Sequence, residues 1–496
     1  MQFGVRQGSL TDAACDALVV NLFAGVQAPG GATGAVDRAL GGAISELIRD
    51  DEFEGRLGDV AVIRTGGASP AKKVLLVGLG DSAGFGALEI MKASAAAIRK
   101  CRELRARTVS SILHGAGIAG MPACECARAV VLGTMLGAYE HKRLKTTGVK
   151  PDSLESFEIV ELSAEKLGDI EKGMRRAEVI GEAICFARDL SNEPSNIVTP
   201  EYLAERAAEI AAEFGMDHSV LDRAGIEKAG LGLIAAVARG SSTEPRFIRI
   251  DYRPQGARRT VAIVGKGVTF DTGGYSLKKP NSMYGMHDDM SGAAAVLAEM
   301  RAIGKLKPSV NVTALIPAVE NAIGSDPIHP GDVFTAFDGR SVEVVSTDAE
   351  GRLILGDTVA YARKLGVDEI IDVATLTGAC VVALGRKISA VIGNDQRLVD
   401  DLIRAGKSSG EKLWQLPLEH DYDDEIKSRI ADLRNKAERW EADAISAALL
   451  IESFSGGVPW AHLDLSSATI VDDEPLARKG STGVGTGTLI EYLMQV

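Results

Sequence analysis

Hydrophobic and polar positions follow two different patterns along this chain. In the first third, short apolar runs that end in glycine predict buried strands at 17–25, 73–80 and 109–117. Apolar residues at helical spacing between two of these runs predict a helix at 87–104. Another strand pattern, at 156–162, closes this part of the chain. Because strands alternate with helices, we expect a mainly parallel sheet.

A long amphipathic segment follows. Apolar residues recur at spacings of three and four between Ile170 and Ala187, with charged residues between them. This spacing predicts a helix over 165–190. A chain of 496 residues is too long for one ordinary domain. We therefore expect a first domain at 1–164, a connecting helix, and a second domain at 191–496.

The second part of the chain predicts a larger α/β domain. Its first helix has clear start and stop signals: Thr199 as N-cap, Pro200 in the first turn, and Gly215 at the end. Strand and helix patterns then alternate, with strands at 260–265, 309–318 and 368–376 and a helix at 292–304. The sequence therefore predicts an α/β protein built from two α/β domains.

Composition and charge narrow the class of protein. Hydrophobic residues make up 46% and aromatic residues 5%, which suits tightly packed α/β domains. The net charge of -13 argues against nucleic acid as the main partner. The six cysteines are dispersed, with only Cys124 and Cys126 close together, which favours a reducing compartment. No signal peptide and no apolar run of roughly 20 residues is visible, so we expect a cytoplasmic protein without membrane segments.

Two charged segments carry the candidate chemistry. The first follows the strand at 260–265 and holds Lys266, Asp271, Lys278, Lys279, Asp288 and Asp289 among glycines and apolar residues. In parallel α/β sheets, ligands bind at the carboxyl ends of strands. We therefore expect these side chains at a binding site.

The second segment is STDAEGRLIL, at 346–355. If it is extended, Asp348, Glu350 and Arg352 point to one side. With Asp271 and Asp289 there are then four candidate carboxylate ligands, enough for two divalent ions about 3.5–4 Å apart. A solvated turn with ordinary ion pairs is the alternative, and spacing alone does not decide between the two.

Other motif matches fail on their context. Asp271-Thr272-Gly273 matches the triplet of aspartic proteases, but no second triplet is present. The G-x-S-x-G match at 406–410 follows a helical pattern instead of a strand. The Gly-Lys-Gly at 265–267 lacks the other residues of a P-loop. No H-E-x-x-H occurs, so a zinc site built on histidines is not expected.

At these residues the chain resembles the leucyl aminopeptidases of the M17 metallopeptidase family. STDAEGRL is similar to that family's Asn-Thr-Asp-Ala-Glu-Gly-Arg-Leu segment, and GKGVTFDTGGYSLK at 265–278 matches its metal-ligand loop. DDMSGAAAV at 288–296 and DVATLTGA at 372–379 also match. The resemblance implies a smaller, macro-like N-terminal domain and a larger catalytic domain with a mixed, mainly parallel central sheet.

The resemblance also implies roles for single residues. One metal ion would be held by Lys266, Asp271, Asp289 and Glu350, and the other by Asp271, Asp348 and Glu350. Lys278 would polarise the scissile carbonyl, and Arg352 would anchor a bicarbonate ion that acts as general base. Met286, Thr375 and Gly378 would form the pocket for the first side chain, and the backbone of Leu376 would contact the substrate.

The sequence departs from the family pattern at four places. Ser346 stands where the family has Asn, Val373 stands where Leu is usual, the segment 441–449 lacks the usual Gly-Gly, and Thr486-Gly487 stand where Val-Arg is common. These differences affect the expected pocket shape and specificity and remove no metal ligand.

We therefore expect an aminopeptidase that releases N-terminal, Leu-like residues from peptides with a free N-terminus. Mn²⁺ or Zn²⁺, with Mg²⁺ as an alternative, suits the oxygen-rich ligands. The resemblance implies a homohexamer. Two other functions stay open at this point: another dinuclear hydrolase such as a phosphoesterase, and a DNA-binding or scaffold protein with the same fold.

Overall fold

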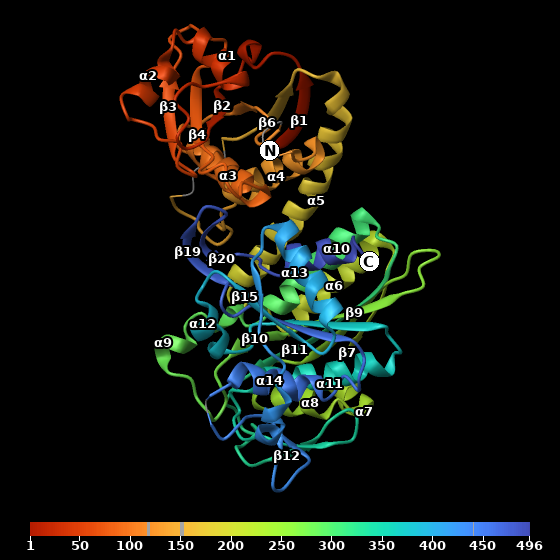
Figure 1. Cartoon of the computed structure of the whole chain (residues 1–496). Coiled ribbons are helices and arrows are strands. Elements are labelled where there is room, and N and C mark those ends of the chain that lie inside the picture. Colours follow the sequence, from red (N-terminus) through yellow and green to blue (C-terminus); the bar gives the residue numbers. More distant parts are fainter. Residues whose placement is uncertain (117–119, 149–152, 440) are drawn as a thin grey trace. The chain divides into compact units, whose positions relative to one another are not determined.

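The computed structural model describes residues 1–496 apart from 117–119, 149–152 and 440. The chain packs as two compact units (Figure 1). The first comprises Met1–Glu182 and Asp472–Lys479, and the second comprises Ala183–Val471 and Gly480–Val496. Helix α5 (Leu167–Asn192) lies where the sequence predicts a helix and contributes residues to both units. The domain bounds predicted from the sequence stay a prediction.

The first unit contains a six-stranded sheet in the order β1-β6-β5-β2-β4-β3. Its neighbouring strands are parallel except for the antiparallel pair β3 and β4. The bounds are β1 (Gln2–Gln7), β2 (Ala17–Leu22), β3 (Val60–Arg64), β4 (Lys73–Gly78), β5 (Thr108–Ser111) and β6 (Ser156–Glu161). The expected mainly parallel sheet is confirmed.

One strand of this sheet is shorter than predicted. The pattern at 109–117 predicts a long strand, but β5 ends at Ser111. The chain turns shortly afterwards, where Gly115 takes a left-handed backbone with φ of 83°. Residue 117 lies outside the described residues.

The helices of the first unit pack through small residues. Their bounds are α1 (Gly31–Ala39), α2 (Ala43–Arg49), α3 (Ala87–Glu103) and α4 (Ala123–Ala138). Two glycines of α4 lie directly against α3. A Cβ on Gly133 would lie 2.3 Å from the carbonyl oxygen of Met91, and one on Gly137 would lie 2.5 Å from the Cα of Ala95. Larger side chains at these positions would force α3 and α4 apart.

The second unit is built on a nine-stranded mixed sheet in the order β16-β15-β18-β14-β9-β11-β8-β7, with β10 also paired to β11. The central strands β18, β14, β9 and β11 are parallel, whereas β7–β8, β8–β11 and β15–β18 are antiparallel pairs. The bounds are β7 (Asp217–Leu221), β8 (Arg246–Tyr252), β9 (Thr260–Gly265), β10 (Gly267–Asp271), β11 (Asn311–Asn321), β14 (Glu369–Ala374), β15 (Ser389–Gly393), β16 (Leu413–Gln415) and β18 (Trp460–Asp464). The mixed, mainly parallel central sheet is confirmed.

Helices cover both faces of this sheet (Figure 1). One layer contains α6 (Pro200–Phe214), α10 (Ser291–Leu306), α13 (Gln396–Ser409) and α15 (Thr486–Leu493). The other contains α8 (Gly232–Val237), α11 (Glu350–Lys364) and α14 (Asp443–Glu452). A hydrophobic core lies between this second layer and the sheet. Its buried residues include Leu353, Leu449 and Trp460.

The remaining elements are short. They are helices α7 (Arg223–Ala229), α9 (Pro280–Met283) and α12 (Gly378–Leu384), strands β12 (Val333–Thr335), β13 (Ser341–Glu343), β17 (Leu433–Arg434), β19 (Ile470–Glu474) and β20 (Ala477–Ser481), and the 3₁₀ helices η1 (Leu10–Asp12), η2 (Ala164–Lys166), η3 (Ala238–Gly240), η4 (Met286–Asp288) and η5 (His420–Ile426). Within the residues that the structure describes, no helix is both long and apolar enough to cross a membrane.

Helix α6 starts and ends as its sequence predicts. The Thr199 hydroxyl accepts a hydrogen bond from the backbone N–H of Tyr202, at 3.2 Å. Pro200 is the first helical residue, and Gly215 ends the helix in a left-handed conformation with φ of 66°. Both ends follow from local chemistry, because the cap and the stop satisfy backbone groups that the helix leaves free.

The conformation expected for 346–352 is wrong. Instead of an extended segment, residues Ser346–Ala349 form a turn and α11 begins at Glu350. Leu353, Ile354 and Leu355 are all buried. The sequence of this part of the helix therefore lacks the alternation of polar and apolar positions that would distinguish it from a buried strand. Glu350 also suits the first helical turn, where the free backbone N–H groups favour a carboxylate.

Candidate metal centre

Lys266 lies between strands β9 and β10 with 3% of its side chain exposed. β9 is a run of buried residues after Thr260 that ends at Gly265. A side chain at Gly265 would collide with the start of α10, since its Cβ would lie 2.7 Å from the carbonyl oxygen of Gly292. The glycine therefore lets the chain pass closely by α10 and carry Lys266 into the interior.

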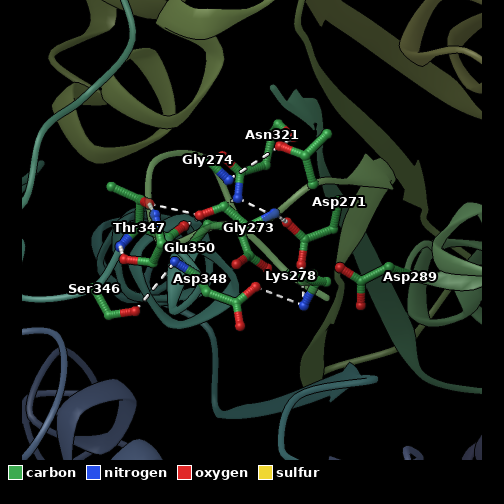
Figure 2. Close-up of polar contacts among 12 residues, drawn as sticks. Asp271, Gly273, Gly274, Lys278, Asp289, Asn321, Ser346, Thr347, Asp348 and Glu350 are labelled. Carbon is green, nitrogen blue, oxygen red and sulfur yellow. Dashed lines mark hydrogen bonds and ion pairs between the residues drawn. The ribbon is translucent and has the colours of Figure 1, made fainter. Parts of the chain in front are cut away.

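Asp271 is the last residue of β10, which pairs with the parallel strand β11. One carboxylate oxygen accepts hydrogen bonds from the Gly273 backbone N–H, at 2.8 Å, and from the Asn321 side-chain amide, at 2.7 Å. The other oxygen lies 2.8 Å from the Lys278 ammonium nitrogen. These contacts hold the carboxylate in one orientation (Figure 2).

Thr347 fastens the turn before α11 to the loop that carries Lys278. Its hydroxyl donates to the carbonyl oxygen of Gly273, at 2.6 Å, and accepts from the backbone N–H of Ser276, at 2.7 Å. Its own N–H donates to the Ser276 hydroxyl, at 3.1 Å. Asp348 follows directly, and its carboxylate lies 2.6 Å from the Lys278 nitrogen (Figure 2). Two segments far apart in sequence thereby form one site.

Asp289 and Glu350 enter the site from helix starts. Asp289 lies two residues before α10, and one of its oxygens accepts hydrogen bonds from the Lys266 ammonium and the Thr375 hydroxyl, both at 2.8 Å. Glu350 is the first residue of α11, and one of its oxygens lies 2.9 Å from the Lys266 nitrogen. The carbonyl of Thr375 also accepts from Lys266, at 3.0 Å.

Burial dominates the electrostatics of the site. It raises the pKa of Asp271 to about 6, with the charge of Glu350 adding to the effect, and it raises the pKa of Asp289 well above its ordinary value. Burial also opposes the charged form of Glu350, but Lys266 and Lys278 lower the pKa of this carboxyl. The pKa of Lys266 is raised, because the carboxylates of Asp289 and Glu350 outweigh its burial. Four carboxyl groups thus face two lysines, and without further positive charge burial favours the neutral forms of Asp271 and Asp289.

The carboxylates have the character of metal ligands. Oxygens of Asp271, Asp348 and Glu350 all lie within 4.8 Å of one another. Among the described residues, the second oxygens of Asp289 and Glu350 are buried without a hydrogen-bond partner. Buried carboxylate oxygens of this kind need a cation or a donor. The residues present therefore fit divalent metal ions.

Arg352 lies in the first turn of α11, but its partners differ from those expected. Its Nη1 and Nη2 atoms lie 3.3 and 3.2 Å from one carboxylate oxygen of Asp443. Nη1 also donates to the carbonyl oxygen of Asn435, at 3.2 Å. The guanidinium is buried and already neutralised by a carboxylate of the chain, so the residues present do not fit an additional bicarbonate at this position.

The four predicted pocket residues lie at two places. Met286 begins η4, three residues before Asp289, and is half-buried. Thr375, Leu376 and Gly378 follow β14, and among the described residues Thr375 contacts the carboxylate cluster through its hydroxyl, which donates to Asp289. The backbone N–H of Leu376 donates to Asp464, at 3.2 Å, which leaves its carbonyl for any contact with a substrate.

Sequence reasoning missed several residues that position the site. Asn321 binds both Asp271 and the carbonyl of Thr347, at 2.7 and 3.0 Å. Asn435 binds the backbone of the turn before α11, and Asp464 binds the segment after β14. Each is a single polar residue distant in sequence from its partners, so no local pattern marks it.

The chain matches two family models. The model of the cytosol aminopeptidase family catalytic domain matches residues 185–490, and the model of that family's N-terminal domain matches residues 19–148. A probable cytosol aminopeptidase of Syntrophotalea carbinolica is 40% identical over 464 residues, which is 93% of each chain. One of Alkaliphilus metalliredigens is 38% identical over 496 residues, which is 99% of each chain.

Two proteins with solved structures share this fold over nearly the whole chain. The bottromycin maturation enzyme BotP, also solved in complex with Mn, is 35% identical with a TM-score of 0.85, over 97% of this chain and 99% of that one. A mutant of tomato leucine aminopeptidase is 31% identical with a TM-score of 0.91, over 100% of this chain and 97% of that one.

Proposed function

This chain belongs to the cytosol aminopeptidase family and is a metal-dependent aminopeptidase, and on that premise we propose how its residues release the N-terminal residue of a peptide. The observation that carries the proposal is the convergence of four carboxylates and two lysines at the ends of β9, β10 and α11.

In this proposal two divalent ions are held by five side chains. Lys266, Asp271, Asp289 and Glu350 hold one ion, and Asp271, Asp348 and Glu350 hold the other. The buried oxygens of Asp289 and Glu350 without hydrogen-bond partners support this assignment. Lys266 has to bind as the neutral amine, because only the unprotonated nitrogen has a lone pair. When bound, the ions supply positive charge and a water of lowered pKa.

Lys278 acts on the substrate carbonyl. Its ammonium lies between Asp271 and Asp348, at 2.8 and 2.6 Å, with 16% of the side chain exposed. A cation held in this way can polarise the scissile carbonyl and stabilise the negative charge that develops on its oxygen. Lys279 is exposed and has no such contacts with the carboxylates in the part of the chain that the structure describes.

Specificity for the end of a chain follows from the free α-amine. An unprotonated amine can complete the shell of one ion, whereas an acylated one cannot. Met286, Thr375, Leu376 and Gly378 form the proposed pocket for the first side chain, and its apolar part supports a Leu-like preference. Because Arg352 is paired with Asp443, no step is assigned to bicarbonate.

The proposal also covers the metal ion, the cellular location and the oligomeric state. Mn²⁺ is supported by the complex of BotP with Mn, while Zn²⁺ and Mg²⁺ remain alternatives for oxygen-rich ligands. The names of the curated relatives support the cytoplasm. The resemblance supports a homohexamer, for which size-exclusion chromatography with light scattering should give six times the 52.1 kDa of one chain.

The test is hydrolysis of leucine p-nitroanilide by metal-stripped protein, before and after Mn²⁺ or Zn²⁺ is added back. N-acetylated leucine p-nitroanilide is the matched control substrate. We expect metal to restore hydrolysis of the free-amine substrate alone. Hydrolysis of the acetylated substrate would contradict the proposal. So would a failure to hydrolyse any of a panel of aminoacyl substrates with any of the metals.

A further inference from the structure

We propose that Asp443 supplies, from the chain itself, the anion that Arg352 holds, so that this enzyme neither binds nor needs bicarbonate. The inference rests on the proposed function, because Arg352 lies two residues after the proposed metal ligand Glu350 on α11. It gives the carboxylate of Asp443 the place at Arg352 that the resemblance assigns to bicarbonate.

The contact is an ion pair between a buried guanidinium and a half-buried carboxylate. Arg352 has 4% of its side chain exposed and Asp443 has 17%. Both terminal nitrogens of the guanidinium share one oxygen of Asp443, and the Asn435 carbonyl takes a further N–H. A buried guanidinium needs an anionic partner, and here a carboxylate of the same chain provides it.

The remaining edge of the guanidinium is buried. Nε of Arg352 has no hydrogen-bond partner among the described residues, so an anion from solvent would have to leave water to bind there, at a guanidinium whose charge Asp443 already neutralises. On the edge formed by the two terminal nitrogens, bicarbonate would have to displace Asp443. Displacement costs affinity, because the internal carboxylate is present at a high effective concentration and loses little freedom on binding.

The backbone around Asp443 holds the carboxylate in place. Asp443 is the first residue of α14, where free N–H groups favour a negative charge. Ala442 before it has a left-handed backbone with φ of 57°, which is strained for a residue with a side chain. Two hydrogen bonds stabilise this conformation: the backbone N–H groups of Ile445 and Ser446 both donate to the Ala442 carbonyl, at 2.9 Å.

The first experiment measures binding without catalysis. Calorimetric titration of bicarbonate into metal-loaded wild-type enzyme should show no binding, whereas Asp443→Gly, which frees the guanidinium, should bind bicarbonate at millimolar concentration. Binding to the wild-type protein would overturn the inference. This result does not depend on aminopeptidase activity, so failure of the proposed function would leave the test intact.

The second experiment measures rescue. In CO₂-free buffer, we expect kcat of Asp443→Gly to fall roughly tenfold or more and to be restored by added bicarbonate, while wild-type kcat stays unchanged by bicarbonate. A merely structural role would give a loss that bicarbonate does not restore, and would overturn the inference. Stimulation of the wild type by bicarbonate would do the same.

A matched control uses another arginine–aspartate pair. Arg239 and Asp326 form an exposed ion pair, with both side chains outside the carboxylate cluster. Asp326→Gly should have the kcat of the wild type, and bicarbonate should not change it. A loss in Asp443→Gly alone then comes from the position and not from replacing an aspartate by glycine in general. If Asp443→Gly does not fold, Asp443→Asn keeps the shape and removes the charge, and its response to bicarbonate tests the same point.

Discussion

Lys278 and Lys279 are neighbours with different surroundings. Lys278 contacts two carboxylates of the cluster, whereas Lys279 is exposed. Sequence spacing assigned the catalytic role to Lys278 only through the resemblance. At the scale of single residues, the contacts of each side chain decide what a substitution does.

Replacing Lys278 by Met should lower kcat about a hundredfold, since one cationic donor to the developing oxyanion is lost. The bound metal, measured by elemental analysis, should stay unchanged. Lys279→Met is the matched control and should keep full activity. Equal losses in the two variants would contradict the role of Lys278.

Asp16 makes a pH-dependent contribution to stability. Its carboxylate lies 2.7 Å from the Lys72 nitrogen and accepts from the backbone N–H of Arg107, at 2.8 Å. The hydrogen bond from Lys72, and then that from Arg107, lower the pKa of Asp16 to about 2. Because the folded-state pKa lies below the unfolded one, the contribution is present above about pH 4 and is lost as the pH falls towards 2.

Asp16→Asn should therefore cost about 1–2 kcal/mol at pH 7, discounted for the exposed Lys72. The difference between the two proteins in the free energy of unfolding, measured in urea, should shrink as the pH falls below 4. The same substitution at exposed Asp50 should have little effect at any pH. A loss for Asp16→Asn that does not change with pH would show that the charge is not responsible.

At the scale of elements, one buried amide ties the short strand β17 to the start of α11. The Asn435 side chain accepts from the backbone N–H groups of Val345 and Ser346, at 2.8 and 3.2 Å. It donates to the carbonyls of Ser346 and Ala349, at 2.7 and 3.2 Å. These bonds fix the turn that presents Asp348 and Glu350.

Asn435→Ala should lower the stability by about 2–3 kcal/mol, because it leaves buried backbone groups unpaired. It should also weaken metal binding, measured by competition with a chelating dye. Ser428, whose hydroxyl accepts from the backbone of Ile430 in the same connection, offers a control by Ser428→Ala. That variant should keep the metal affinity of the wild type.

At the scale of the whole molecule, metal binding should couple to folding. The buried carboxylates repel one another, and an ion that binds only the folded state stabilises it. An ion at a hundred times its Kd should stabilise the folded state by about 2.7 kcal/mol. Scanning calorimetry should therefore show a thermal midpoint that falls on chelation and rises with added Mn²⁺. Asp348→Asn should reduce this dependence. A midpoint insensitive to every divalent metal would contradict the metal centre.

The elements were predicted from sequence where the pattern was local. The buried strands β2, β4 and β9 and the capped helix α6 lie where their residues predict them. The segment before Leu353 was assigned wrongly, because a helix buried on all sides and a buried strand have the same apolar pattern. Asn321 and Asn435 had no signal, since a single amide acts only through its distant partners.

By itself, the sequence determined the α/β class, the start and stop of well-capped elements, and which charged residues are candidates for chemistry. These properties depend on the type of each residue and on residues that are close to it in the sequence. Only the tertiary structure decided which charges meet. The contacts of Lys278 with Asp348 and of Arg352 with Asp443 join residues 70 and 91 positions apart. Such pairs depend on how strands and helices pack, and packing is a property of the whole chain.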